Sequence, residues 1–111
     1  MNTFQVLEDA IELCRLVRPV AEQVEKHDRK LAAQLRDSAQ STPANIAEGK
    51  HRRGGHQRER FGTAYGSAQE VKAHLRVAEA LGYCTAACIA KPLDLADKVA
   101  ASLWRCLHRT R

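Results

Sequence analysis

The densest group of side chains able to do chemistry is the segment KHRRGGHQRER, residues 50–60. It carries five Lys or Arg residues and one acid, so five minus one gives +4 of the chain's formal net charge of +5. Clustered cations attract phosphate groups, and the affinity gained by releasing counterions falls steeply as salt rises. The pattern therefore predicts a nucleic-acid-binding surface that includes cationic residues of the C-terminal segment as well: Lys50, Arg52, Arg53, Arg58, Arg60, Arg105 and Arg109.

Two features of this segment limit the prediction. A charged turn exposed to solvent is common on any soluble protein. No aromatic residue lies among the bases of residues 50–60, which argues against base stacking and favours recognition of the backbone or of shape.

Other residue types in the chain suggest no reaction. Serine, cysteine and histidine are present, but no nucleophile elbow, phosphate-binding glycine loop or zinc-protease pair occurs. Glu48 and Asn45 lack a catalytic partner, so we expect Glu48 to accept hydrogen bonds from Asn45, Tyr65 or Ser67 inside the fold. Cys84 and Cys88 lack the spacing of a structural zinc site, and we expect reduced thiols, no metal and no cofactor. The sequence predicts a protein that is not an enzyme.

The elements that position these residues are helical. The chain has 111 residues, 44% of them hydrophobic and 28% charged, which fits a single domain over 1–111 with a real core. Apolar positions recur every three or four residues over 4–24, 29–51, 56–82 and 89–109. Matched lengths and short loops predict an all-α, antiparallel up-down-up-down four-helix bundle, in which the second and fourth helices end at the same pole.

Prolines and glycines mark expected details of these helices. We expect a kink at Pro19, a bend at Pro43, and Pro92 in the first turn of the last helix. Gly54-Gly55 predicts a turn and Gly82 a helix end, with Asp28 as a helix cap. Gly62 and Gly66 are expected to allow close helix contact.

The first helix carries a second apolar line that is wider than one partner surface requires. Val6, Leu13 and Val20 form this line, and we interpret it as an oligomer interface. Phe4 and Trp104 are expected to be anchors of the core or of an interface. No apolar run reaches the roughly 20 residues that cross a bilayer, and acids stand where a secretory signal would have bases, so we expect a cytoplasmic protein without a membrane partner.

Two stretches of the chain resemble a known family. LAAQLRDSAQSTPANIAEGKHRR and RFGTAYGSAQEVKAHLRVAEALGY are similar to the four-helix-bundle proteins encoded in bacterial 23S rRNA intervening sequences, a family that includes the accessory variability determinants of diversity-generating retroelements. The most specific piece is Pro43 to Gly49, and the motif residues are Pro43, Asn45, Glu48, Gly49, Gly66, Ser67 and Glu70. The Gly54-Gly55 insertion and Ala68 depart from the usual pattern.

The resemblance implies a ring-shaped homopentamer whose accessory members bind nucleic acid and a reverse transcriptase through a basic surface. We therefore expect a non-enzymatic homo-oligomer that binds RNA or DNA through a basic pole. The resemblance implies that it acts as an accessory to a reverse transcriptase or to an rRNA-associated element. The alternative is a protein–protein interaction adaptor with no nucleic-acid role, whose arginines meet an acidic partner or simply aid solubility.

Overall fold

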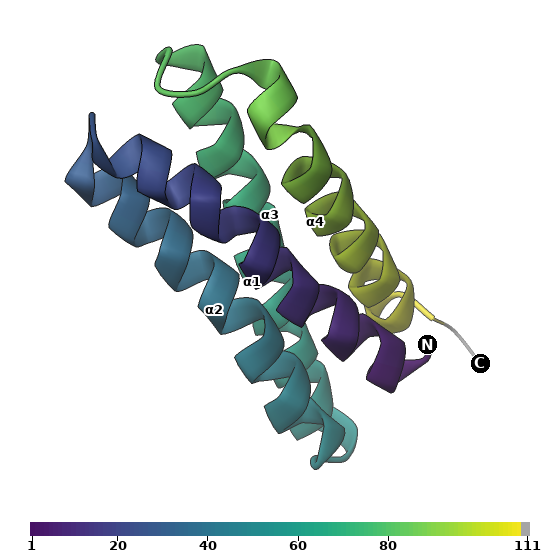
Figure 1. The fold of residues 1–111 in the computed structure, drawn as a ribbon. Coiled ribbons are helices and arrows are strands. Elements are labelled where there is room, and N and C mark those ends of the chain that lie inside the picture. Colours follow the sequence, from purple (N-terminus) through teal and green to yellow (C-terminus); the bar gives the residue numbers. More distant parts are fainter. Residues whose placement is uncertain (110–111) are drawn as a thin grey trace.

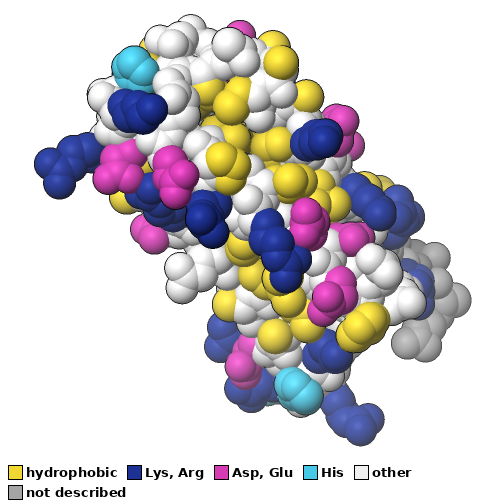
Figure 2. All heavy atoms as spheres, viewed as in Figure 1, with side chains coloured by type: hydrophobic (Ala, Val, Ile, Leu, Met, Phe, Trp, Pro, Cys, Tyr) yellow, Lys and Arg dark blue, Asp and Glu magenta, His cyan; other side chains and the backbone are white. Residues whose placement is uncertain are grey.

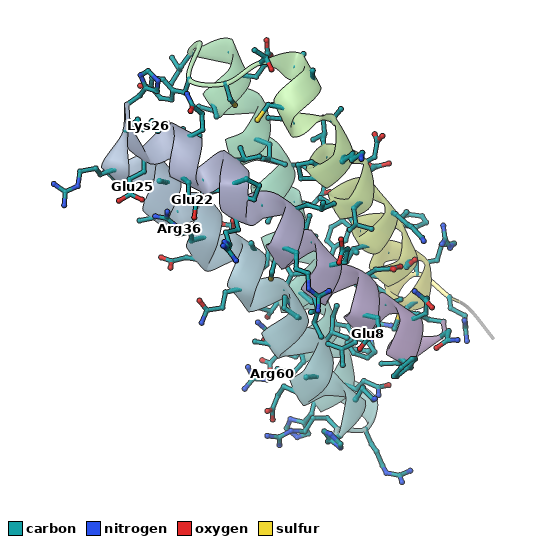
Figure 3. All side chains as sticks on the ribbon, viewed as in Figure 1. Glu8, Glu22, Glu25, Lys26, Arg36 and Arg60 are labelled. Carbon is teal, nitrogen blue, oxygen red and sulfur yellow. The ribbon has the colours of Figure 1, made fainter. Side chains whose placement is uncertain are left out.

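Four helices make up most of residues 1–109, the part of the chain that the computed structural model describes (Figure 1). They are α1 (Thr3–Glu25), α2 (Arg29–Lys50), α3 (Gly54–Ala80) and α4 (Ala86–Leu107). α1 packs against α2 and α4, and α3 packs against the same two helices. The predicted four-helix bundle is confirmed, with extents of 45 × 20 × 18 Å. An ion pair of 2.6 Å between Arg36 of α2 and Glu25 of α1 crosses between the first two helices (Figure 3).

Three helices begin with a side-chain cap. The side chains of Asn2, Asp28 and Thr85 accept hydrogen bonds from backbone amides of the following turns, which satisfies donors that have no partner within the helix. α3 has no such cap. It begins at Gly54, whose φ of +57° lies in the left-handed region that glycine enters without steric cost. The connection lies at residues 51–53, so Gly54 and Gly55, where the turn was predicted, are the first two residues of the helix, which starts two residues before the expected position 56.

The end of α3 explains the geometry of the third connection. Gly82 has a φ of +79°, and its amide donates to the carbonyl of Glu79 at 3.0 Å. The amide of Tyr83 donates to the carbonyl of Ala78 at 2.9 Å, and the two bonds together make a Schellman motif. The predicted helix end at Gly82 is confirmed.

The three prolines all lie within helices. α1 and α2 continue through Pro19 and Pro43. The prediction for Pro92 was wrong, because Thr85 caps α4 and the helix begins at Ala86. Pro92 therefore lies beyond the first turn, in the helix interior.

The interior divides into two apolar clusters along the bundle. One lies toward the α1–α2 connection and includes Leu13, Leu35 and Leu75. The other lies toward the two termini and includes Ile46 and Phe61.

The interpretation of Val6, Leu13 and Val20 as an oligomer interface was wrong. Their exposed fractions are 5%, 0% and 1%, so these side chains form the core of a single chain. α1 contacts α2 on one side and α4 on the other, and an inward face with two neighbours requires a wide apolar stripe. The large apolar side chain of α1 that is exposed to solvent is that of Phe4, with an exposed fraction of 63%.

The glycine that allows two helices to pack closely is not one of those predicted, Gly62 and Gly66. A Cβ placed on Gly62 or Gly66 would have no atom within 4 Å, so neither glycine permits a close approach within the bundle. A Cβ on Gly49 would lie 2.5 Å from Cε1 of Phe61. Gly49 is therefore the residue that lets α2 and α3 come together.

Candidate nucleic-acid interface

The connection between α2 and α3 forms a cationic end of the bundle. Lys50 is the last residue of α2, and Arg52 and Arg53 lie in the connection itself. An open hollow there is lined almost entirely by polar groups, from Lys50, His51, Arg52, Arg53, Gly54 and Gln57. Figure 2 shows dark-blue and cyan side chains gathered at this lower end, with magenta side chains more frequent over the middle. We call the group Lys50, Arg52, Arg53, Arg58 and Arg60 the basic pole.

Gln57 fixes the shape of this connection. Its Nε2 donates to the carbonyl of Gly49 and to the carbonyl of Arg52, both at 3.1 Å. The Gly49 carbonyl, at the end of α2, also accepts from the backbone amide of Arg52 at 3.1 Å, and the Arg52 carbonyl lies in the connection, outside the helical hydrogen-bond pattern. The sequence did not reveal the role of Gln57, because this role depends on α3 beginning at Gly54, which turns residue 57 toward α2.

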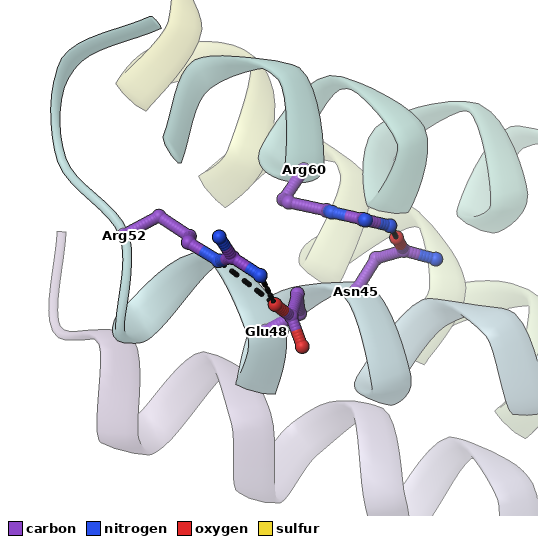
Figure 4. Close-up of polar contacts among 4 residues, drawn as sticks. All are labelled: Asn45, Glu48, Arg52 and Arg60. Carbon is purple, nitrogen blue, oxygen red and sulfur yellow. Dashed lines mark hydrogen bonds and ion pairs between the residues drawn. The ribbon is translucent and has the colours of Figure 1, made fainter. Parts of the chain in front are cut away.

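Arg52 is held by an acid on the preceding helical turn. Its Nε donates to Oε2 of Glu48 at 2.8 Å, and its guanidinium makes a second contact with the same oxygen (Figure 4). The hydrogen bond from Arg52 lowers the pKa of the Glu48 carboxyl, and the positive charge of Arg52 adds to this effect. The predicted bonds from Asn45, Tyr65 or Ser67 to Glu48 are absent among residues 1–109. Glu48 lies on the outer face of α2, where Arg52 is the neighbour one turn away.

A polar network does link α2 and α3, but without Glu48. Nδ2 of Asn45 donates to the carbonyl and to the hydroxyl oxygen of Ser41, at 2.9 and 3.0 Å. The Ser41 hydroxyl lies 2.7 Å from that of Ser67, a buried residue of α3. Arg60 donates to Oδ1 of Asn45 at 3.3 Å (Figure 4). The network therefore orients one residue of the basic pole.

The start of α3 and the end of α4 meet at the same pole. Nη2 of Arg58 donates to the carbonyl of Leu107, in the last turn of α4, at 2.8 Å. The second and fourth helices thus end together, as the topology predicted. Arg105 and Arg109 lie on the far side of this contact, beside a hollow formed by the start of α1 and the end of α4. The predicted cations therefore share one end of the molecule but occupy two adjoining surfaces.

Lys50 and Arg53 are the cations of the basic pole that remain free. Both are exposed, and within residues 1–109 neither forms an ion pair or a side-chain hydrogen bond. The others are engaged by Glu48, Asn45 or the Leu107 carbonyl. The remaining motif residues Gly66 and Glu70 are exposed on α3, away from the pole.

Two other kinds of site are absent from the described part of the chain. No group of three or more His, Cys, Asp or Glu side chains over residues 1–109 is arranged to hold a metal ion. Over the same residues, no helix is both long enough and apolar enough to cross a membrane.

Comparison with known proteins places this arrangement in a family. The model of the 23S rRNA-intervening sequence protein family matches residues 2–105. Among solved structures, the chain resembles a protein of unknown function from the S23 ribosomal protein family of Bacteroides thetaiotaomicron. The TM-score is 0.85 with 15% identity, over 94% of this chain and 99% of the other. No match was found among curated proteins. Since the family model spans nearly the whole chain, the protein belongs to the 23S rRNA-intervening sequence protein family.

Proposed function

We propose that this protein is a non-enzymatic homo-oligomer that binds RNA or DNA through the basic pole. The observation that carries the proposal is the free state of Lys50 and Arg53 beside three further arginines that are held in place. Free cations release counterions when a phosphate replaces them, and oriented arginines present fixed donors to phosphate oxygens.

The ordered arginines support backbone recognition in a specific way. Arg52, Arg58 and Arg60 each use part of the guanidinium for a contact within the protein. Each guanidinium carries five N–H donors, so donors remain for a phosphate after the internal contact is made. Less side-chain entropy is then lost on binding than for three freely rotating arginines.

Self-association would multiply this charge. A net +4 from residues 50–60, repeated in a pentamer, gives five times four, or +20, around one assembly. Since Val6, Leu13 and Val20 are buried, we propose that the contact between copies uses the outer line of α1 instead. Phe4 is exposed and Leu7 and Ile11 are half-buried on this line, and Figure 2 shows apolar side chains along this face.

The test is the salt dependence of binding to generic duplex DNA and RNA. For duplex DNA, the slope of log K against log salt is about −0.9 per phosphate neutralised. We expect the double variant K50Q/R53Q to weaken binding and to make the slope shallower by roughly 1 to 2. The matched control K26Q/K30Q removes the same charge near the α1–α2 connection, at the other end of the bundle, and is expected to change the slope much less.

Two outcomes would reject the proposal. Binding that is absent or insensitive to salt would remove the nucleic-acid role and favour the adaptor alternative. Equal losses in both double variants would show a response to net charge alone, without a role for the basic pole.

A further inference from the structure

Trp104 is an exposed aromatic side chain held rigidly at the end of α4. It is 46% exposed, and one face of its indole is stacked by the imidazole of His108, with ring centroids 4.1 Å apart and planes 18° apart. Nδ1 of His108 lies 2.9 Å from the carbonyl oxygen of Trp104. Because a carbonyl only accepts, Nδ1 carries the hydrogen and donates it. The stacked pair is thereby fixed by a hydrogen bond as well as by ring contact.

A groove between α3 and α4 begins at Trp104. Its lining includes Tyr65, two alanines of α4, and Arg105 at one end. Polar groups stand along its border: Nζ of Lys72 donates to Asp97 at 2.7 Å and to Oε1 of Gln69 at 3.3 Å. The amide nitrogen of Gln69 has no partner over residues 1–109. The groove thus combines aromatic surface, a floor of small side chains, free hydrogen-bonding groups and a cation.

We propose that this groove binds an unpaired base of single-stranded nucleic acid, which stacks on Trp104 while the adjoining phosphate meets Arg105. The inference rests on the proposed function and deepens it. Aromatic side chains beside cations are the usual arrangement for unpaired bases, since every base has a face that stacks. Trp104 lies one turn before Leu107, whose carbonyl binds Arg58, so a strand crossing the basic pole passes close to the groove.

The surroundings of Trp104 favour a base over a second copy of the chain. Protein interfaces bury broad apolar surfaces, about 800 Å² on each partner in a standard case. The other large exposed apolar side chains are Phe4 on α1, Val77 near the end of α3, and Leu81 just beyond that end. None of these lines the groove, so no second large exposed apolar side chain of residues 1–109 stands beside Trp104 there.

The test uses Trp104 as its own probe, because it is the single tryptophan of the chain. Its fluorescence is followed while the protein is titrated with an oligothymidylate of about ten nucleotides, within the site sizes common for single-strand binding. An abasic oligomer of the same length and a duplex serve as probes with phosphates but without free bases. We expect quenching by the oligothymidylate only.

Variants separate this inference from the proposed function. W104A should weaken single-strand binding by roughly 5- to 150-fold, as loss of one stacked base does elsewhere, and leave duplex binding unchanged. W104F should retain part of the affinity. K50Q/R53Q should weaken both substrates while quenching at saturation persists. Circular dichroism is expected to show unchanged helix content, since Trp104 is exposed.

Four results would overturn the inference. If the protein binds duplex but single strands do not quench the tryptophan, the base site is rejected and the role of the basic pole is retained. Equal quenching by the abasic oligomer would show that phosphate binding, and not base stacking, changes the fluorescence of Trp104. Absence of binding to every probe would reject the proposed function as well. Dissociation of oligomers by W104A, with single-strand affinity unchanged, would assign Trp104 to a contact between copies.

Discussion

The thiol of Cys14 donates a hydrogen bond to the carbonyl oxygen of Ala39 at 3.3 Å. That carbonyl would normally accept from the amide of residue 43, four positions later, but residue 43 is proline and has no amide hydrogen. Ala39 is only 3% exposed, so water has little access to the orphaned carbonyl. The cysteine on α1 thus supplies the donor that Pro43 removes from α2, and it helps α2 to continue through the proline.

A double-mutant cycle tests this relationship. C14A should destabilise the fold by about 1–2 kcal/mol, because a buried acceptor loses its partner. The same substitution in a P43A background should cost less by about 0.5–1 kcal/mol, since the new amide bonds to Ala39. Free energies of unfolding from denaturant titration provide the four values. Equal costs of C14A in both backgrounds would show that the thiol and the proline are not coupled.

A second prediction concerns the contact between Gly49 and the ring of Phe61. Phe61 is 3% exposed, so the ring has no free space into which it can retreat from a new methyl group. G49A should therefore destabilise the protein by about 1–3 kcal/mol, although alanine is the better helix former. G66A is the matched control: nothing lies within 4 Å of its added Cβ, and it should be neutral or stabilise by up to about 1 kcal/mol. Thermal unfolding of both variants measures the difference, and a stabilised G49A would contradict the close approach.

The sequence was sufficient for the helices and for their order, because stripes of apolar residues at helical spacing depend on local periodicity. It was not sufficient to separate core from surface on α1. Val6 and Phe4 are both apolar and two residues apart, and only the positions of α2 and α4 decide that Val6 faces inward. The close-contact glycine was missed for a similar reason. Gly49 and Gly66 look alike in sequence, and the difference lies in which of them faces Phe61.

The candidate site, too, could be predicted only in part from the sequence. The basic pole was evident as a run of cations, since the residues are neighbours in sequence. The partners of those cations, Glu48, Asn45 and the Leu107 carbonyl, lie four, fifteen and 49 residues away. The groove at Trp104 could not be predicted from the sequence. Trp104 is far from residues 50–60 along the chain, and only the bundle brings the start of α3 beside the end of α4.

The two apolar lines of α1 give a third prediction. L13A removes a side chain that is 0% exposed, so it should cost about 2–5 kcal/mol of folding free energy. F4S removes a side chain that is 63% exposed and should change the stability of the single chain by less than about 0.5 kcal/mol. If copies associate through the outer line, F4S should instead lower the mass measured by light scattering. An unchanged mass for F4S in a protein that does associate would place the contact elsewhere.

The Glu48–Arg52 pair predicts a dependence on pH. The hydrogen bond from Arg52 lowers the pKa of Glu48 in the folded protein. A lowered folded-state pKa means that the pair favours folding above the ordinary glutamate pKa of about 4.3 and that this contribution is lost as pH falls through the folded value. Carboxyl chemical shifts followed by NMR should show a Glu48 pKa below the ordinary value, and R52Q should raise it. K50Q retains Arg52 and should leave the Glu48 pKa low; an equal rise in K50Q would show a general charge effect.

The same pair limits how much charge the basic pole offers to phosphate. Glu48 engages two nitrogens of Arg52, so E48Q removes one negative charge and releases the guanidinium. E48Q loses the orientation of Arg52 but gains one net positive charge, and we expect the charge to have the larger effect. E48Q should therefore bind duplex DNA more tightly, with a slope of log K against log salt steeper by up to about 0.9, one further phosphate contact. E79Q makes the same change of charge near the C-terminal end of α3, at the opposite end of the bundle. It should raise affinity only slightly and leave the slope unchanged, because a charge at that distance is screened at physiological salt. Fluorescence anisotropy across a salt series measures both variants. Weaker binding by E48Q would show that the orientation of Arg52 by Glu48 contributes more to binding than the charge that Glu48 neutralises.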